Sequence, residues 1–422
     1  MFLLNWFKVG LVKVADYYTA WTWPYDEFTR HAYFSPHPFD NKEELFFSDL
    51  IQNFRVVTND TTIVWNYKRN ANGSFDLGDQ ALWHGVTTFM LCLKYSQEPT
   101  AELENIIVKS ANGMMLHQRA NWEIPRLVRG VKDALGREYQ DDASNDTLTG
   151  HLLGIYGLLK YGPKASRSLG VTLSRNIANS LISHNYCLTN ADGSTTKHGR
   201  LVYGVLTDAL NLSLCLTALK MASSTLSFMC DDYERPYQEL VAKHKEIIPY
   251  GHVTLGTLRH DYDAHRPAIA YSILADLEKD HDISRLYVQG LMRSWKRERK
   301  SRNPWIYYLM RRAMLMDPSD KEGCIVRLAE MDIVYKSPVL ERKNSENALA
   351  WEKDGIRFFE YGGHLRASQP LPLWMLGSQD FFWQRCQYSV DDWLGSVPPA
   401  NEFHNGLDYL VAYWGFRELK FL

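Results

Sequence analysis

Carboxylates gather at two places in the first third of the chain, in a pattern that suits acid–base chemistry. Asp79 lies in the sequence FDLGDQALWHG, and Asp142 and Asp146 lie in YQDDASNDTLTGH. Glycoside hydrolysis requires two carboxyl groups, one protonated as a general acid and the other acting as a base or nucleophile. Asp142 and Asp146 are four residues apart, so on a helix they would share one face. We therefore expect Asp79 to act with one of these two residues.

Helix capping is the alternative interpretation of these acids. Asp, Asn, Ser and Thr are favoured at helix N-termini, where acids also interact well with the helix dipole. Capping accounts for an acid at each helix start, but it does not account for the histidines that accompany the acids. The sequence therefore leaves both interpretations open for Asp79, Asp142 and Asp146.

Histidine, aromatic and arginine side chains near these acids complete the candidate site. His198 is a further catalytic candidate, because imidazole exchanges protons near neutral pH. An aromatic ring suits the apolar face of a pyranose, and a guanidinium group can bind an anionic sugar through paired hydrogen bonds. Core packing for each Trp and a solvated surface position for each Arg are the alternatives. The expected substrate-binding residues are Trp83, His84, Trp122, Arg126, His151, Arg200, Tyr203 and His265.

Periodic apolar residues predict the helices that position these side chains. Leu82, Val86 and Phe89 follow the spacing of one helix face. Helices that are apolar all round, such as GHLLGIYGLLKYG, alternate with helices that carry charges on one face, such as AELENIIVKS. The first kind is buried on every side and the second lies at the surface. The expected exposed-then-buried pairs are 43–55 with 79–95, 101–118 with 145–161, 167–184 with 200–221, 230–248 with 266–279, 281–300 with 304–316, and 320–334 with 405–417.

Six such pairs close most simply into an (α/α)6 toroid, so we predict an all-α fold of that class. Because no pair can bury its own apolar face, residues 43–422 are expected to form one domain, preceded by an N-terminal docking segment at 1–42. Strand-like sequence predicts a small β element, as an insertion at about 335–400 and again at 61–67. An open α-solenoid is the alternative, although the regular period of such arrays is missing.

The predicted inner helices begin with polar residues that differ from ordinary caps. In a toroid these helices run parallel and open on one face, and a histidine accompanies five of the six starts: His84, His151, His198, His265 and His404. The architecture and this placement resemble the six-hairpin, (α/α)6-toroid glycosidase superfamily over about residues 43–417. That resemblance implies a funnel at the inner-helix N-termini, where carboxylates cleave a glycosidic bond or a Tyr or His base eliminates across it.

The sequence thus predicts a carbohydrate-active enzyme, first of all a glycoside hydrolase acting on an oligo- or polysaccharide without a cofactor. A polysaccharide lyase is the second interpretation, in which Tyr203 or His198 removes a proton while Arg200 and Arg126 neutralise a uronate carboxylate. The third is a non-catalytic glycan-binding protein or a structural component of a larger particle such as a phage tail.

Composition and motifs narrow the partners and the compartment. With Lys+Arg 47 against Asp+Glu 49, the net charge of −2 argues against a dedicated nucleic-acid binder. No uncharged apolar stretch reaches the roughly 18–20 residues of a membrane span. Residues 1–20 are apolar but lack the basic start of a secretory signal, so we expect them to dock on the body or on a protein partner. Synthesis in a cytoplasm, with release as part of a particle, is the expected localisation.

The sequence supports a metal site less well than it supports a carbohydrate-binding site. The six cysteines form no CxxC pair and no zinc-finger spacing. The acidic group at 141–146 departs by one residue from the boxes with which terpene synthases hold Mg²⁺, and the His/Asp alternation at 260–265 is a short loop pattern. We therefore expect no metal.

Overall fold

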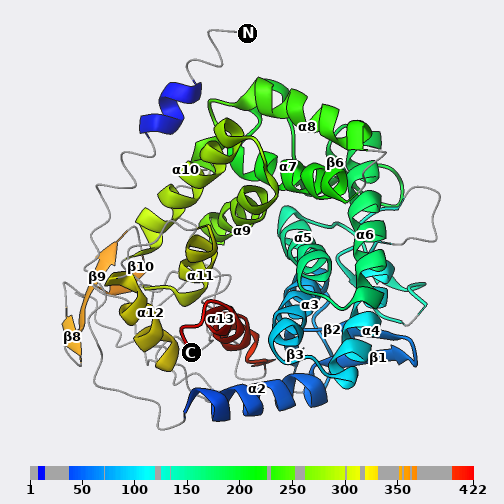
Figure 1. Ribbon diagram of the computed structural model, residues 1–422, viewed down its shortest axis with the longest axis vertical. Coiled ribbons are helices and arrows are strands. Elements are labelled where there is room, and N and C mark those ends of the chain that lie inside the picture. Colours follow the sequence, from blue (N-terminus) through cyan, green and yellow to red (C-terminus); the bar gives the residue numbers. More distant parts are fainter. Residues whose placement is uncertain are drawn as a thin grey trace.

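The computed structural model describes residues 8–14, 38–70, 72–118, 125–133, 135–225, 230–251, 262–299, 302–313, 319–330, 351–353, 356–361, 364–367 and 402–422. Within these ranges the chain is predominantly helical, with a few short antiparallel strands (Figure 1). The predicted all-α class is therefore confirmed for the described part of the chain.

From residue 38 onward, the α-helices of the described residues follow one another in pairs, each of which matches a predicted pair. The largest difference is at the third pair, where residues 195–200 form a strand and the second helix begins at Ala209 instead of residue 200. The first helix begins at Phe39, inside the segment expected to precede the domain. The pairs are α2 (Phe39–Asn53) with α3 (Gln80–Gln97), α4 (Ala101–His117) with α5 (Asn145–Lys160), α6 (Lys164–Ser183) with α7 (Ala209–Ser224), α8 (Cys230–His244) with α9 (Tyr262–Leu277), α10 (His281–Glu298) with α11 (Pro304–Arg312), and α12 (Ser319–Ala329) with α13 (Leu407–Glu418).

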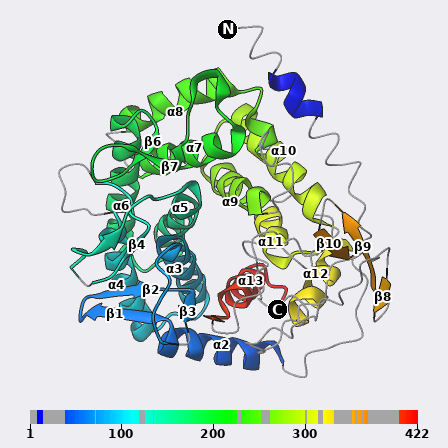
Figure 2. The same ribbon diagram turned by 180° about the vertical axis from the view of Figure 1, so that it is seen from behind.

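The second helix of each pair lies inside and the first lies outside (Figures 1 and 2). The inner helices α3, α5, α7, α9, α11 and α13 contact one another in that order, and α13 returns to contact α3. Burial follows this arrangement, because α3 is buried continuously from Gln80 to Leu93 and α5 from Thr147 to Leu158. Most charged residues of the outer helices are exposed or half-buried, although Lys42 and Arg327 are buried. The expectation that all-round apolar helices are buried on every side is confirmed.

Glycines allow α3 and α5 to approach closely. A Cβ atom added at Gly85 would lie 2.0 Å from the carbonyl oxygen of Gly150, and one added at Gly150 would lie 2.2 Å from that of Leu82. Real Cβ atoms do not come so close to backbone atoms, so neither position accepts a side chain without a shift of one helix.

We predict that Gly150→Ala lowers the free energy of unfolding by about 2 kcal/mol or more. Overpacking a core costs roughly 1–3 kcal/mol, and here the added methyl group meets backbone, which cannot rotate away. Chemical denaturation measures the change. Gly10→Ala is the control, since its Cβ would meet nothing within 4 Å in the helix at residues 8–14. Equal stability of Gly150→Ala and the wild type would show that the helices are farther apart.

Paired strands bring the starts of α3 and α13 together. The strand β3 (Lys68–Asn70) pairs antiparallel with β11 (Glu402–His404), and each precedes one of these helices. Next to them, the hydroxyl of Tyr67 donates a hydrogen bond to the carboxylate of Asp408, at 2.9 Å. The first and last inner helices therefore begin at the same end of the molecule.

The starts of α5, α7 and α9 lie at that end as well. The side-chain amide of Asn145 donates to the side-chain oxygen of Asn211 at 2.9 Å, which joins the beginnings of α5 and α7. An ion pair of 2.8 Å between Asp146 and Arg266 joins α5 to α9. We call this end of the inner helices the N-terminal face.

The opposite end is held by a buried network around one guanidinium group. The Arg312 guanidinium lies 4.7 Å from the ring centroid of Tyr156. The Tyr156 hydroxyl donates to Asp276 at 2.7 Å, and the Tyr308 hydroxyl donates to Glu418 at 2.8 Å. We call this network, which joins α5, α9, α11 and α13, the Arg312 cluster; its members are Tyr156, Tyr161, Ser272, Asp276, Tyr308, Arg312 and Glu418.

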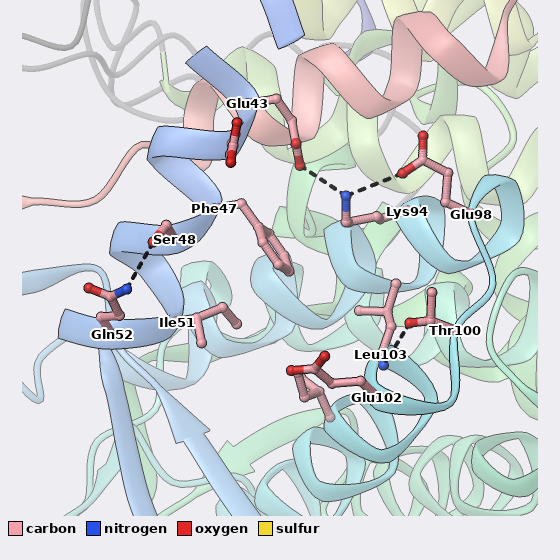
Figure 3. Close-up of a pocket in the computed structure, with 12 residues that line it drawn as sticks. Glu43, Phe47, Ser48, Ile51, Gln52, Lys94, Glu98, Thr100, Glu102 and Leu103 are labelled. Atoms are coloured by element: carbon pink, nitrogen blue, oxygen red, sulfur yellow. Dashed lines mark hydrogen bonds and ion pairs between the residues drawn. The ribbon is translucent and has the colours of Figure 1, made fainter. Parts of the chain in front are cut away.

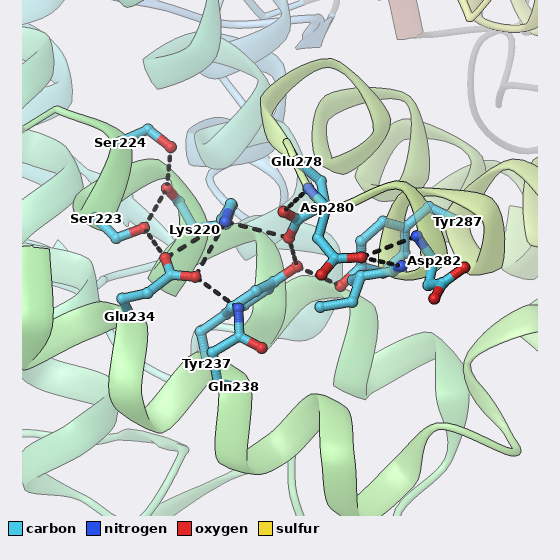
Figure 4. Close-up of polar contacts among 11 residues, drawn as sticks. Lys220, Ser223, Ser224, Glu234, Tyr237, Gln238, Glu278, Asp280, Asp282 and Tyr287 are labelled. Atoms are coloured by element: carbon cyan, nitrogen blue, oxygen red, sulfur yellow. Dashed lines mark hydrogen bonds and ion pairs between the residues drawn. The ribbon is translucent and has the colours of Figure 1, made fainter.

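A second buried ion network joins α7, α8, α9 and α10 (Figure 4). The Lys220 ammonium lies 3.2 Å from Glu234 and 3.1 Å from Glu278. Tyr237 donates to Glu278 and shares a hydrogen bond of 2.7 Å with Tyr287. Each carboxylate has a cation or hydroxyl partner, as buried charges require. This network fixes neighbouring hairpins to each other.

The short strands confirm the strand predictions where the structure describes them. β1 (Arg55–Asn59) and β2 (Thr62–Trp65) form a hairpin at the expected 61–67 segment. β8 (Trp351–Lys353), β9 (Ile356–Tyr361) and β10 (His364–Ala367) form a three-stranded sheet in the expected insertion. The remainder of the insertion lies outside the described residues.

The described part of the N-terminal segment contacts the body of the molecule, and Val9 packs against the hydrophobic core. Lys8, in the helix at residues 8–14, donates a hydrogen bond to the carbonyl of Thr207, just before α7. Val12 is buried, whereas Leu11 and Val14 are exposed. In the part of the chain that the structure describes, none of the helices has the length and apolar character needed to cross a bilayer.

Candidate functional site

Asp79 and Asp146 stand at the N-terminal face, and neither caps a helix. Asp79 occupies the N-cap position of α3, but its side chain accepts no capping hydrogen bond; its nearest ion-pair partner is Arg129, at 3.8 Å. Asp146 lies in the first turn of α5, whose N-terminus is capped instead by Ser144. Neither acid therefore makes a capping hydrogen bond, although Asp146 in the first turn of α5 still interacts favourably with the helix dipole. Both carboxyl groups are therefore candidates for acid–base chemistry.

The two carboxyl groups differ in their electrostatic surroundings. Burial raises the pKa of Asp79, and the negative charge of Asp146 raises it further. The positive charges of Lys68 and Arg129 lower it, but the net direction is upward. Asp146, by contrast, forms an ion pair of 2.8 Å with Arg266. A carboxyl group with a raised pKa thus lies near a carboxyl group that is ion-paired, and acid–base catalysis uses such an unequal pair.

Asp142 does not share a helix face with Asp146. It precedes the helix in a left-handed backbone conformation, with φ of 65°, and α5 begins only at Asn145. Its carboxylate accepts the backbone N–H of Lys197 at 2.8 Å. The prediction of an i, i+4 pair was wrong because Ser144, not Asp142, starts the helix. Asp142 instead anchors the neighbouring hairpin, which consists of β6 (Cys187–Thr189) and β7 (Thr195–Arg200).

That hairpin carries the other accessible candidates. His198 and Arg200 are both exposed on β7. Tyr203 is 50% exposed, and the Arg200 guanidinium lies 4.7 Å from the centroid of its ring. The hydroxyl of Thr196 donates to the carbonyl of Ala143 at 2.7 Å, which seats the hairpin beside the start of α5. His198, Arg200 and Tyr203 therefore remain predicted site residues.

Most of the other predicted binding residues are buried and cannot contact a substrate from solution. The Trp83 ring is 2% exposed and stacks on Tyr67 with centroids 3.8 Å apart, so its expected role as a sugar platform is wrong. Arg126 is buried in an ion pair with Asp141. The physical reason is shared: the helix starts are packed more deeply than their polar composition indicates. The buried group is Trp83, His84, Arg126, His151 and His265, while Trp122 lies outside the described residues.

His84 and His151 belong to a buried histidine cluster between α3, α4 and α5. The His84 ring contacts the Ser110 carbonyl at 3.0 Å and His117 at 3.1 Å, and His151 contacts the Gln118 amide at 3.0 Å. Burial lowers the pKa of His84 and of His151 from 6.5 to about 3. Both rings are therefore neutral near pH 7, and their role is structural.

This burial predicts acid sensitivity. Between about pH 6.5 and pH 3 the unfolded chain binds protons at His84 and His151 that the folded chain does not bind. The free energy of unfolding should therefore fall as pH is lowered through this range, by up to about 1.4 kcal/mol per pH unit for each histidine. Urea denaturation from pH 7 to pH 4 measures the slope. His151→Gln should make the slope shallower, and an unchanged slope would exclude His151 as a contributor.

Arg266 was missed by the sequence reasoning, which selected its neighbour His265. Arg266 lies near the N-terminus of α9, where the helix dipole disfavours a cation. A basic residue at this position requires an acidic partner. The sequence could therefore have predicted that Arg266 forms an ion pair, which the structure shows with Asp146. The identity of the partner depends on how α5 and α9 are placed in space, which no local pattern contains.

No family model and no curated protein sequence matches the chain. The candidate site is therefore defined by the geometry of its own residues. Among the described residues, no group of three or more His, Cys, Asp or Glu side chains is arranged to hold a metal ion. The carboxyl pair Asp79 and Asp146, with Arg129 and Arg266 beside it, is thus the candidate site.

Proposed function

We propose that this protein is a carbohydrate-active enzyme with an (α/α)6-toroid fold, and that it hydrolyses glycosidic bonds of an oligo- or polysaccharide. The observation that carries the proposal is the unequal carboxyl pair at the N-terminal face. Adjacent inner helices supply Asp79, whose pKa is raised by burial and by the nearby anion, and Asp146, which is ion-paired with Arg266. Glycosidases need this combination of a protonated and an ionised carboxyl group.

In this mechanism Asp79 is the general acid. Its proton passes to the glycosidic oxygen as the bond to the anomeric carbon breaks, so the leaving sugar departs as an alcohol. The Arg129 guanidinium, 3.8 Å away, then stabilises the carboxylate that Asp79 becomes. Asp146 either attacks the anomeric carbon as nucleophile, forming a glycosyl ester that water then hydrolyses, or takes a proton from the water molecule that attacks this carbon. Arg266 holds the Asp146 side chain in place.

The hairpin of β6 and β7 is the proposed substrate contact. It presents His198, Arg200 and Tyr203 to solvent beside the start of α5. An exposed aromatic ring and a guanidinium group suit stacking on a sugar and hydrogen bonding to its hydroxyl or carboxylate groups. This assigns binding to the hairpin and bond cleavage to the inner helices.

The contact between Arg200 and Tyr203 also favours the second candidate, a polysaccharide lyase. There Tyr203 or His198 would take the C5 proton and Arg200 would neutralise the uronate carboxylate. Arg126 does not take part, since it is buried against Asp141. Asp79 would then be dispensable for the chemical step.

A glycan screen on the purified full chain separates these candidates. Reducing ends and the absorbance of unsaturated products are followed together in the wild type, Asp79→Asn and Asp142→Asn. Reducing ends without absorbance, lost in Asp79→Asn and kept in Asp142→Asn, would support the hydrolase. Unsaturated products that persist in Asp79→Asn would support the lyase. Glycan binding without turnover would refute both and favour a non-catalytic role in a larger particle.

A further inference from the structure

A groove lies between the outer helices α2 and α4 (Figure 3). It has a volume of about 460 Å³ and is bounded by α2, the end of α3 and the start of α4. Asp79 is at the beginning of α3 and Glu98 follows its end, so this 18-residue helix separates them by about 27 Å. The floor consists of the apolar side chains Phe47, Ile51, Leu103 and Ile106.

The charged residues around the groove are mainly acidic. The single lysine, Lys94, lies 3.2 Å from Glu43 and 3.5 Å from Glu98, and its ammonium stands 4.9 Å from the Phe47 ring centroid. Glu98 is also 3.1 Å from Arg417. The charges of Glu43 and Glu98 are therefore compensated within the molecule.

The negative charges of two further glutamates that line the groove are not compensated by such ion pairs. Glu44 on α2 and Glu102 on α4 line opposite sides of the groove, and both are exposed. Among the described residues, neither has an ion pair or a side-chain hydrogen bond. The groove thus presents an apolar floor with an unmatched negative charge on each side.

The groove offers little to a sugar. The Ser48 hydroxyl already accepts from the Gln52 amide at 2.9 Å, and the Thr100 hydroxyl caps α4 through the N–H of Leu103 at 3.1 Å. A ligand that needs many hydrogen bonds would lose more to desolvation than it gained here. The complementary ligand instead has an apolar stripe flanked by cations.

We propose that this groove binds a basic amphipathic helix of a partner protein. The apolar side of that helix would contact Phe47, Ile51, Leu103 and Ile106, and its Lys or Arg residues would pair with Glu44 and Glu102. The groove follows α2 from Glu43 to Gln52, about 14 Å, which accommodates between two and three helical turns. Recognition of a helix in a groove uses this combination of apolar anchors and flanking charges. The proposal is independent of the proposed enzymatic function.

The probe is a labelled 14-residue helical peptide with leucines at i, i+3, i+4 and i+7 and lysines beside them, titrated with the full chain by fluorescence anisotropy. A second peptide carries glutamates in place of the lysines. The wild type should bind only the lysine peptide. The variant Glu44→Lys/Glu102→Lys should bind it at least 10-fold more weakly and should bind the glutamate peptide better.

Two further variants complete the test. Glu239→Lys/Glu246→Lys changes the net charge equally at exposed positions on α8 and just after it, and should bind the lysine peptide like the wild type. Ile51→Asn should weaken binding while helix content and the midpoint of thermal unfolding stay close to those of the wild type. The proposal is overturned if the lysine peptide does not bind, if the Glu44/Glu102 variant binds it like the wild type, or if the control variant loses as much affinity.

Discussion

Asp79→Asn should reduce glycan turnover by roughly 10²–10⁴-fold, the range that general acid–base catalysis contributes, with little change in stability. The asparagine keeps the shape of the side chain but has no proton to donate to a departing oxygen. Because Asp79 accepts no capping hydrogen bond in α3, the substitution removes no contact that holds the helix. Initial rates on the substrate found by the screen, together with thermal unfolding, measure both effects.

The pH profile provides a second readout of the same assignment. A general acid with a raised pKa keeps its proton to higher pH, so activity should be lost on the alkaline side as Asp79 ionises. The charge of Arg129 lowers the pKa of Asp79, so Arg129→Gln should move that alkaline limb to higher pH. A limb that stays in place would mean that another group is the acid. Asp142→Asn serves as the matched control, with an unchanged limb expected.

Arg312→Leu should lower the free energy of unfolding by about 2 kcal/mol or more, because it removes a partly buried cation beside an aromatic ring and a hydrogen bond to the Ser272 hydroxyl. The guanidinium lies over the Tyr156 ring, and the carboxylates of Asp276 and Glu418 belong to the same network. Without Arg312 the Tyr156 and Tyr308 rings lose the cation beside them, while Asp276 keeps Lys160 at 2.6 Å. Urea unfolding followed by circular dichroism measures the loss.

The neighbouring Arg311 is the control for this second prediction. It occupies the next position on α11 and has no ion pair or hydrogen bond among the described residues. Arg311→Leu should change stability by less than about 0.5 kcal/mol, as is usual for substitutions away from a buried network. Comparable losses in both variants would show that the cluster contributes nothing specific. Turnover by the surviving folded fraction should be normal in both, because the cluster lies opposite the N-terminal face.

The sequence predicts the helices well because hydrophobic periodicity reports burial directly. The repeats that begin at Leu82 and Leu148 lie in α3 and α5, both buried on every side. The alternation of charged and apolar helices likewise predicts which helix of each pair faces solvent. These features depend on neighbours along the chain, so local patterns are sufficient to find them.

The site was predicted less completely, for reasons that particular residues illustrate. In a helix buried all round, no charged face shows which side points to the centre, so His84 and His151 were selected although both are buried. Asp142 was placed on the helix because the Ser144 cap was not distinguished from its polar neighbours. The ion pair of Asp146 with Arg266 joins residues from different hairpins, and only the folded chain brings them together.

Contact between the first and last inner helices has a consequence for biosynthesis. The bond from Tyr67 to Asp408 spans 341 residues, and that from Tyr413 to Asp40 spans 373. While the ribosome is still translating the middle of the chain, α3 has left the exit tunnel but the surface that α13 will cover has no partner. Such an apolar surface on a nascent chain is a substrate for chaperones and a starting point for aggregation. The yield of native protein should therefore depend on how soon after α3 the helix α13 is synthesised.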